Sequence, residues 1–180
     1  MNLQEQFDKI MCELKQGHRA LVRFQMSELE ILEVKLNTNL ETKNYDQLEK
    51  VLCLVEHSAA LHPKFEAGIL KAINSDLPDH LLIFALNGAR KHIIQAKFQR
   101  GQRLNYEFLE ALKKLLQSTS PEVVEWTLRT IEECGNQGVY FLREFDKIKP
   151  PPWKWFNPHQ RAVREIITLL ERRWSRFEKP

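Results

Sequence analysis

The residues best suited to chemistry in this chain are its histidines and cysteines, and their spacing matches no catalytic or metal-binding pattern. The six histidines contain no HExxH pair, and the chain has neither a GxSxG turn nor a glycine-rich phosphate loop. Cys12, Cys53 and Cys134 are far apart and form no CxxC pair, so they predict buried small side chains in a reducing compartment. The sequence therefore predicts a protein that is not an enzyme and that has no cofactor and no metal.

Cations gather in the middle of the chain, where no Asp or Glu occurs between residues 80 and 106. His92 stands among these cations and is interpreted as part of a polar helix end rather than as a general base. A helix end attracts cations through its dipole, and a basic surface attracts phosphates or acidic proteins, so both interpretations stay open. The candidate binding residues here are Arg90, Lys91, Lys97, Arg100 and Arg103.

A second candidate region is the segment PPPWKWF, which begins at residue 150. Consecutive prolines favour an extended polyproline II conformation, and aromatic side chains this dense are seldom left in water. Trp153 and Trp155 therefore either fold back on the protein, form a ligand for another protein, or stack on nucleic-acid bases. The helix predicted after them carries the remaining candidate cations, Arg164, Arg172 and Arg173.

A repeat of helix pairs is predicted to position these residues. Residues 63–92 return 43 positions later as residues 106–135, a register that pairs Phe65 with Phe108. Each copy predicts an apolar helix, a short polar turn and a second helix that begins at proline. A period of this size built from helix pairs is typical of an α-solenoid.

The two copies, FEAGILKAINSDLPDHLLIFALNGA and FLEALKKLLQSTSPEVVEWTLRTIEECG, resemble HEAT-like repeats of the armadillo type. In that family a helix ends in a short Asp/Ser turn and a helix begun by proline follows it. The resemblance covers residues 45–148, and the second helices lack the arginine that usually follows the turn, so the repeats are degenerate. It implies a short right-handed solenoid in which the first helices of each pair (63–74, 105–117 and 139–147) line a concave surface that binds protein.

Further helices are predicted at both ends of the repeats. Residues 2–37 predict one long amphipathic helix, weakened at Gly17, that either caps the first repeat or dimerises. At the other end, Asn157 and Pro158 are an N-cap and a first-turn residue. The apolar stripe of this C-terminal capping helix is Val163, Ile166, Ile167, Leu170 and Trp174.

The helix that begins at Pro78 is predicted to be the most buried element of the repeats. Residues 81–86 are apolar on every side, which places Phe84 in the core. We expect this helix to extend to about Phe98, because Gly101 supplies the glycine that commonly follows a helix C-terminus.

Length and composition agree with this architecture. A chain of 180 residues with 43% hydrophobic and 28% charged residues suits one globular domain with an appendage. We expect a capping helix over residues 1–40, repeats over 41–149, and a linker with a capping helix over 150–180. No signal peptide or membrane span is apparent, so the expected location is the cytoplasm, with no membrane partner.

The sequence thus predicts an all-α, HEAT-like solenoid that acts as a non-enzymatic protein-interaction module, a scaffold or adaptor for another protein with acidic character. The alternative is a nucleic-acid-binding helical repeat that uses the basic residues of 90–103 and the C-terminal helix. A net charge of +3 does not favour that alternative by itself. The salt dependence of binding distinguishes the two hypotheses, because phosphate binding weakens steeply as salt rises whereas an apolar protein interface does not. The oligomeric state is left open.

Overall fold

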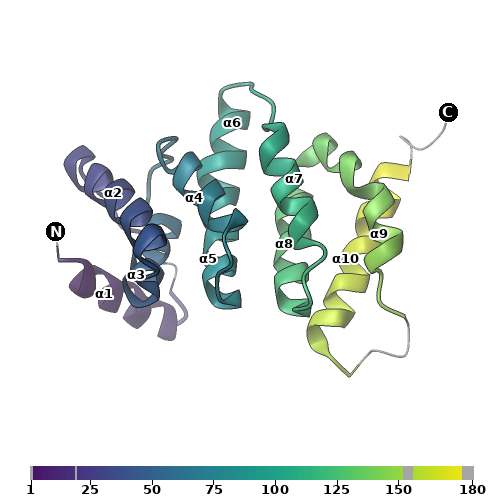
Figure 1. Cartoon of the computed structure of the whole chain (residues 1–180), viewed down its shortest axis with the longest axis horizontal. Helices are drawn as coiled ribbons and strands as arrows, with labels where there is room; N and C mark the ends of the chain where they lie inside the picture. Colours follow the sequence, from purple (N-terminus) through teal and green to yellow (C-terminus); the bar gives the residue numbers. More distant parts are fainter. Residues whose placement is uncertain (1, 19, 152–155, 176–180) are drawn as a thin grey trace. The chain divides into compact units, whose positions relative to one another are not determined.

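The structure, a computed structural model, describes residues 2–18, 20–151 and 156–175 (Figure 1). Helices form the regular structure in these ranges, so the all-α prediction is confirmed. No helix in this part of the chain is long and apolar enough to cross a membrane.

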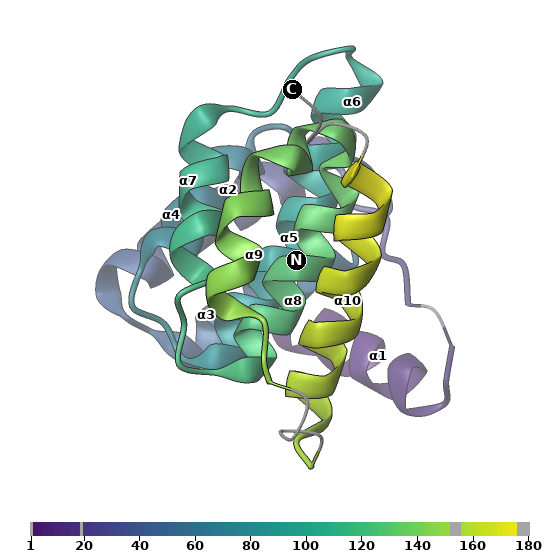
Figure 2. The same ribbon diagram turned by 90° about the vertical axis from the view of Figure 1, so that its right-hand side faces the viewer.

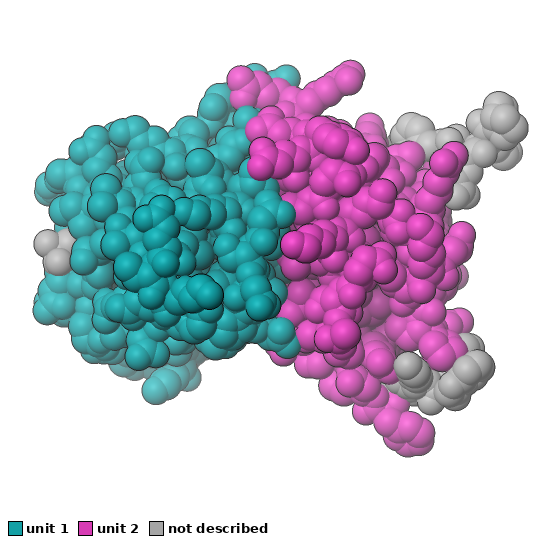
Figure 3. All heavy atoms as spheres, in the orientation of Figure 1, with its two compact units in different colours: residues 1–101 teal, residues 102–180 magenta. Residues whose placement is uncertain are grey.

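The chain forms two compact units, Met1–Gly101 and Gln102–Pro180 (Figure 3). Their boundary lies inside the predicted repeat region of residues 41–149. Gly101 has a positive φ of 66° and ends the last helix of the first unit. Residues 99–103 are polar and exposed, so no core forms at this point of the chain.

The described part of the first unit contains seven helical segments. They are α1 (Leu3–Lys15), α2 (Met26–Thr42), α3 (Tyr45–Glu56), α4 (Phe65–Asn74), α5 (Asp79–Ala89), the π-helix η1 (Arg90–Gln95) and α6 (Ala96–Gln99). Residues 51–55 of α3 are completely enclosed, because α1, α2 and α5 each pack against this helix. By contrast, Phe84 of α5 is only half-buried. The prediction that Phe84 lies in the core is therefore wrong, since an apolar surface on every side of a helix does not guarantee that every side is covered.

The N-terminal segment departs from the prediction of one helix over residues 2–37. Helix α1 ends before Gly17, whose φ is 76°, and α2 begins only after an extended stretch. In that stretch Val22 forms an isolated parallel bridge with Ser58, and its N–H donates to the His57 carbonyl at 2.8 Å. The single-helix prediction was wrong because this pairing with a distant segment satisfies the backbone in place of helical hydrogen bonds.

The two predicted helix pairs are present, one in each unit. In the first unit α4 packs against α5, and in the second α7 (Tyr106–Leu115) packs against α8 (Pro121–Glu133). Ser120 caps α8, because its hydroxyl accepts the N–H of Val123 at 3.5 Å, and the helix begins at Pro121 as predicted. Pro78 lies at the N-cap position of α5, one residue before the helix.

A 3-10 helix, η2 (Gly135–Phe141), joins α8 to α9 (Leu142–Ile148) in the second unit. The sequence predicts an α-helix over residues 139–147, and the first of these residues take the tighter 3-10 form instead. Gly135 has a positive φ of 59°, which turns the chain at the end of α8.

The last helix, α10 (Pro158–Trp174), packs along α8 (Figures 1 and 2). The Asn157 side chain accepts the N–H groups of His159 and Gln160 at 2.9 and 3.2 Å, which confirms the predicted N-cap. Ile166 of the predicted apolar stripe is half-buried. The other four residues of the stripe are buried, namely Val163, Ile167, Leu170 and Trp174.

Trp174 fixes the end of α10 to the rest of the second unit. Its ring stacks on Phe145 of α9, with centroids 6.3 Å apart and an interplanar angle of 19°. The same ring occupies the space that a Cβ atom would take at Gly138 of η2. A residue without a side chain is therefore required at position 138.

Candidate functional site

The five cations predicted over residues 90–103 differ in their surroundings. Lys97 forms an ion pair with Glu66 of α4, with Nζ 3.1 Å from Oε1 and with side chains that are only 14% and 21% exposed. Arg100 is exposed, and Arg103 follows in the second unit. The positive charge available to a partner here is smaller than the sequence suggests, because Lys97 is neutralised within the first unit.

Arg90, Lys91 and His92 lie in the π-helix η1, beside the C-terminal end of α3. His92 is completely buried, with Nε2 2.8 Å from the carbonyl oxygen of Val55, while Nδ1 accepts the N–H of His62 at 2.9 Å. Since Nδ1 is an acceptor, the ring is neutral and carries its proton on Nε2, which donates to Val55. The interpretation of His92 as a polar helix end was wrong, because segments distant in sequence cover it.

Burial keeps two groups of this site uncharged at mildly acidic pH, below the pKa of Glu56 and above that of His92. Burial lowers the pKa of His92 to about 4. Burial also raises the pKa of the Glu56 carboxyl to about 7, although the charges of Arg90 and Lys91 and a hydrogen bond from Asn87 act in the opposite direction. Lys91 Nζ donates to the Glu56 carbonyl at 3.4 Å. His92 and Lys91 thus donate hydrogen bonds to the last carbonyls of α3. The site is therefore a structural polar network that gives His92 no access to a substrate proton.

The arginines predicted as binding residues in α10 divide into two sets. Arg173 Nη2 lies 2.8 Å from Glu132 Oε1 of α8, and Arg164 Nη1 donates to the Pro150 carbonyl at 2.7 Å. Arg172 is exposed, and its side chain makes no hydrogen bond or ion pair with any described residue. Of the three candidate arginines, only Arg172 thus has a side chain without a polar contact to the described residues.

Trp153 and Trp155 lie outside the described residues, and the second unit has another aromatic surface that the sequence does not predict. Tyr106 and Tyr140 are 68% and 38% exposed, and their rings meet edge to face with centroids 6.2 Å apart. Lys113 lies over the Tyr140 ring, 5.6 Å from its centroid. We name this feature, formed by α7, η2 and α9, the tyrosine surface; it consists of Tyr106, Glu110, Lys113, Tyr140, Glu144 and Lys147.

Polar contacts hold the tyrosine surface together. The Tyr140 hydroxyl donates to the Glu110 carboxylate, and this bond raises the pKa of Tyr140, so its phenol stays protonated at neutral pH. Glu144 accepts from Lys147 at 3.0 Å, which lowers the pKa of Glu144, and lies 3.5 Å from Lys113. Two carboxylates and two ammonium groups thus balance, and the surface carries little net charge.

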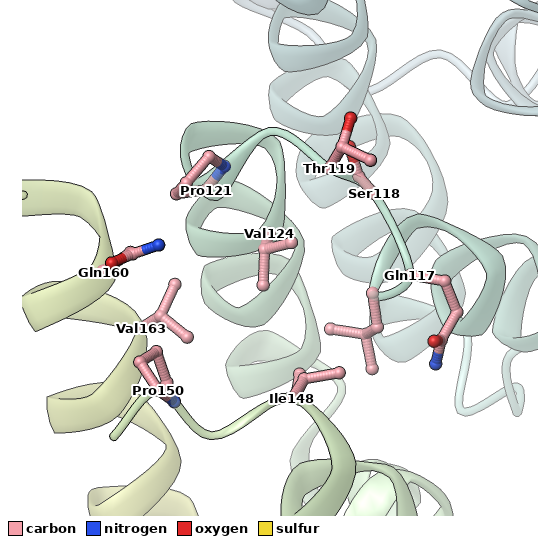
Figure 4. A pocket seen from close by; sticks show the side chains of 10 residues that line it. Gln117, Ser118, Thr119, Pro121, Val124, Ile148, Pro150, Gln160 and Val163 are labelled. Atoms are coloured by element: carbon pink, nitrogen blue, oxygen red, sulfur yellow. The ribbon is translucent and has the colours of Figure 1, made fainter. Parts of the chain in front are cut away.

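A cavity of about 230 Å³ lies within the second unit, between the α7–α8 turn and the first turn of α10 (Figure 4). Apolar side chains form its walls, among them Leu116, Val124, Ile148, Pro150 and Val163. Its polar groups are neutral amides and hydroxyls, from Gln117, Ser118, Thr119 and Gln160. None of these residues ionises near neutral pH, so the described lining supplies no general acid or base.

The thiols of the chain are free, and two of them are buried. Burial raises the pKa of Cys53 and of Cys134 to about 12, so neither is a reactive thiolate at neutral pH. Within the described ranges, no group of three or more His, Cys, Asp and Glu side chains is placed to hold a metal ion. No protein-family model matches this chain, and no curated protein or solved structure matches it significantly.

Proposed function

We propose that this chain is a non-enzymatic protein-interaction module, a helical scaffold or adaptor that binds its partner through the tyrosine surface. The observation that carries the proposal is the exposed pair Tyr106 and Tyr140. Tyrosine is enriched among the residues that dominate binding energy at protein interfaces, because its ring offers a large contact area and its hydroxyl a hydrogen bond.

The fixed geometry of the pair supports this role. Tyr140 is held by Glu110 at its hydroxyl and by Lys113 over its ring, and Tyr106 packs against its edge. Side chains that are ordered before binding lose less conformational entropy when a partner arrives. A partner that covers both rings therefore gains most of their contact energy.

The charge balance of the tyrosine surface supports a protein partner over nucleic acid. A phosphate backbone is bound by cations that are free to replace its counterions. Lys113 and Lys147 both pair with Glu144, and outside this surface Lys97 and Arg173 also have carboxylate partners. Raising the salt concentration during affinity capture tests the nucleic-acid alternative, because salt releases bound nucleic acid.

We further propose that the helix pairs are HEAT-like repeats of a short right-handed solenoid. The 43-residue register of the two copies supports this architecture, and both tyrosines fall within predicted first helices, residues 105–117 and 139–147. Superposition of α4–α5 on α7–α8 in this register tests the proposal, and helix pairs that match only in another register would contradict it. The three free cysteines support a location in the reducing cytoplasm.

Affinity capture from a native lysate tests the function. The full chain, the double variant Tyr106→Ala/Tyr140→Ala and the control Phe98→Ala are each immobilised, and captured proteins are quantified by mass spectrometry. Phe98 is a matched control because it is a 42% exposed aromatic residue in the first unit. We expect one partner that the wild type and the control retain in buffers from about 0.1 M to about 0.5 M salt, and that the tyrosine variant loses.

Two outcomes contradict the proposal. Equal capture of the same proteins by the tyrosine variant would show that the partner binds elsewhere. Capture of nucleic acid that is released as salt rises would favour the nucleic-acid alternative.

A further inference from the structure

The outward side of α10 presents basic residues around one exposed leucine. Leu169 is 47% exposed, whereas its neighbour Leu170 faces the core. Leu169 lies in a hollow of about 310 Å³ in the surface of the second unit. We name this feature the arginine face; its described residues are Arg161, Arg164, Glu165, Thr168, Leu169 and Arg172.

The arginine face has a surplus of positive charge that the rest of α10 lacks. Arg173, on the side toward α8, is neutralised by Glu132 at 2.8 Å. The arginine face instead combines three arginines with one glutamate, which leaves a surplus of two positive charges. The side chains of Arg161 and Arg172 are exposed and form no ion pair with the described part of the chain.

Arg164 is oriented before any ligand binds. Its Nη1 donates to the Pro150 carbonyl at 2.7 Å, which restrains the guanidinium group. A guanidinium has five N–H donors, so the remaining donors of Arg164 are available to a carboxylate. A restrained arginine loses less entropy on binding than a mobile one.

The combination of arginines with an exposed leucine selects one kind of occupant. Phosphate oxygens would use the three arginines but gain nothing from Leu169, whereas a protein segment offers both carboxylates and an apolar side chain. From position 161 to position 172 an α-helix rises about 16 Å, which is the length of about five extended residues. A short linear segment is therefore long enough to span the arginine face.

We propose that the arginine face binds an acidic segment of a partner protein, which seats one apolar side chain on Leu169 and places carboxylates on Arg161, Arg164 and Arg172. The proposal rests on the proposed function only in taking the chain to be an interaction module, and it uses a surface other than the tyrosine surface. Binding falls as salt rises, because the carboxylate contacts are exposed, and it also depends on Leu169.

Selection from a phage-displayed library of random peptides, about twelve residues long so that they span the face as strand or helix, tests this directly. The bait is the full-length protein, and the selected peptides are then synthesised for titration. We expect enrichment of peptides in which Asp or Glu residues flank an apolar residue. Their affinity should fall about tenfold or more for Arg161→Glu/Arg172→Glu, and about tenfold for Leu169→Ala.

Arg143→Glu is the matched control, because it reverses an exposed cation of α9 in the same unit. Affinity for this control should equal that for the wild type, and circular dichroism should show that all variants are folded. The proposal is overturned if no acidic peptides are enriched, or if they bind Arg161→Glu/Arg172→Glu as tightly as the wild type. It is also overturned if a single-stranded oligonucleotide displaces the peptides and Leu169→Ala binds them normally, since phosphates then account for the site.

The two proposals fail separately. Tyr106→Ala/Tyr140→Ala should bind the selected peptides like the wild type while it loses the partner captured from lysate. Loss of the captured partner without any selected acidic peptide would contradict only the arginine face, and selected peptides without a tyrosine-dependent partner would contradict only the tyrosine surface.

Discussion

Replacing Glu56 with glutamine tests the buried polar network at the end of α3. Burial raises the pKa of Glu56 from 4.5 to about 7, so the native protein holds a proton that the unfolded chain releases between these pH values. The raised pKa of Glu56 therefore stabilises the protein fully below pH 4.5, and this contribution is lost as the pH rises to about 7. Because one unit of pKa shift corresponds to about 1.4 kcal/mol, the whole loss is about 3 kcal/mol.

His92 has the opposite effect on stability. Burial lowers its pKa from 6.5 to about 4, so the native protein excludes a proton that the unfolded chain binds, and stability is lost as the pH falls from 6.5 to about 4. Between pH 4.5 and pH 6.5 both groups change stability with pH, in opposite directions, so their effects on the free energy of unfolding nearly cancel. In Glu56→Gln the effect of His92 is no longer offset by that of Glu56, so acid should destabilise this variant more steeply than the wild type. Its stability relative to the wild type should rise by about 3 kcal/mol from pH 4.5 to pH 7.

Urea unfolding at a series of pH values measures this difference. All four tryptophans fall within residues 102–180, so tryptophan fluorescence reports the unfolding of the second unit. Far-UV circular dichroism reports both units, and the part of its change that fluorescence does not show reports the unfolding of the first unit. His57, whose pKa burial also lowers, titrates in both proteins and cancels in the difference.

His92→Gln is the matched variant with the opposite sign, since its stability relative to the wild type should rise as the pH falls. If the free energies of unfolding of Glu56→Gln and the wild type ran parallel from pH 4.5 to pH 7, the proposed electrostatics of this network would be refuted.

Three further predictions concern packing, ion pairs and thiols. Gly138→Ala should destabilise the second unit by about 1–3 kcal/mol in urea unfolding followed by fluorescence, because the new methyl group collides with the Trp174 ring, and an unchanged midpoint would contradict that contact. Arg173→Ala should lower stability by less than about 1 kcal/mol, because its ion pair is well exposed. Lys97→Ala should lower it by about 2 kcal/mol or more, because its pair is largely buried, and equal melting temperatures for the two variants would contradict this ranking. In the native protein only Cys12 should react rapidly with an aromatic disulfide reagent, and two or more rapid thiols would contradict the burial of the others.

Helix ends were the part of the fold that local sequence predicted well. Ser120 and Asn157 cap α8 and α10, and Gly101 follows the long helical stretch that begins with α5, as expected. Each of these signals acts through a backbone conformation or a hydrogen bond that spans only a few residues. The apolar stripe of α10 was equally local, because its spacing places Val163 and Trp174 on one side of the helix.

Contacts between distant segments decided what the sequence could not predict. The bridge between Val22 and Ser58 replaced part of the predicted N-terminal helix, although the apolar spacing continued through that stretch. His92 is enclosed by the end of α3 and by the chain near His62, which lie 37 and 30 residues earlier in the sequence. A polar residue among cations looks the same in sequence whether its surroundings are solvent or another helix.

The candidate sites were predictable only in part. The helix ranges implied by the family resemblance contain both Tyr106 and Tyr140, but no local pattern indicates that their rings meet or that Glu110 holds Tyr140. Three arginines of α10 were identified as candidates, yet the contacts of Arg173 with Glu132 of α8 and of Arg164 with the Pro150 carbonyl could not be predicted from the sequence.

Photo-crosslinking at position 106 tests the interaction-module proposal most directly. The full chain with p-benzoylphenylalanine in place of Tyr106 is irradiated in native lysate, and the same probe at Phe98 serves as the control. We predict one discrete protein adduct at position 106 that excess wild-type protein suppresses and that the control lacks. No protein adduct at position 106, an adduct with nucleic acid, or the same adducts from position 98 would contradict the proposal that the tyrosine surface binds a protein.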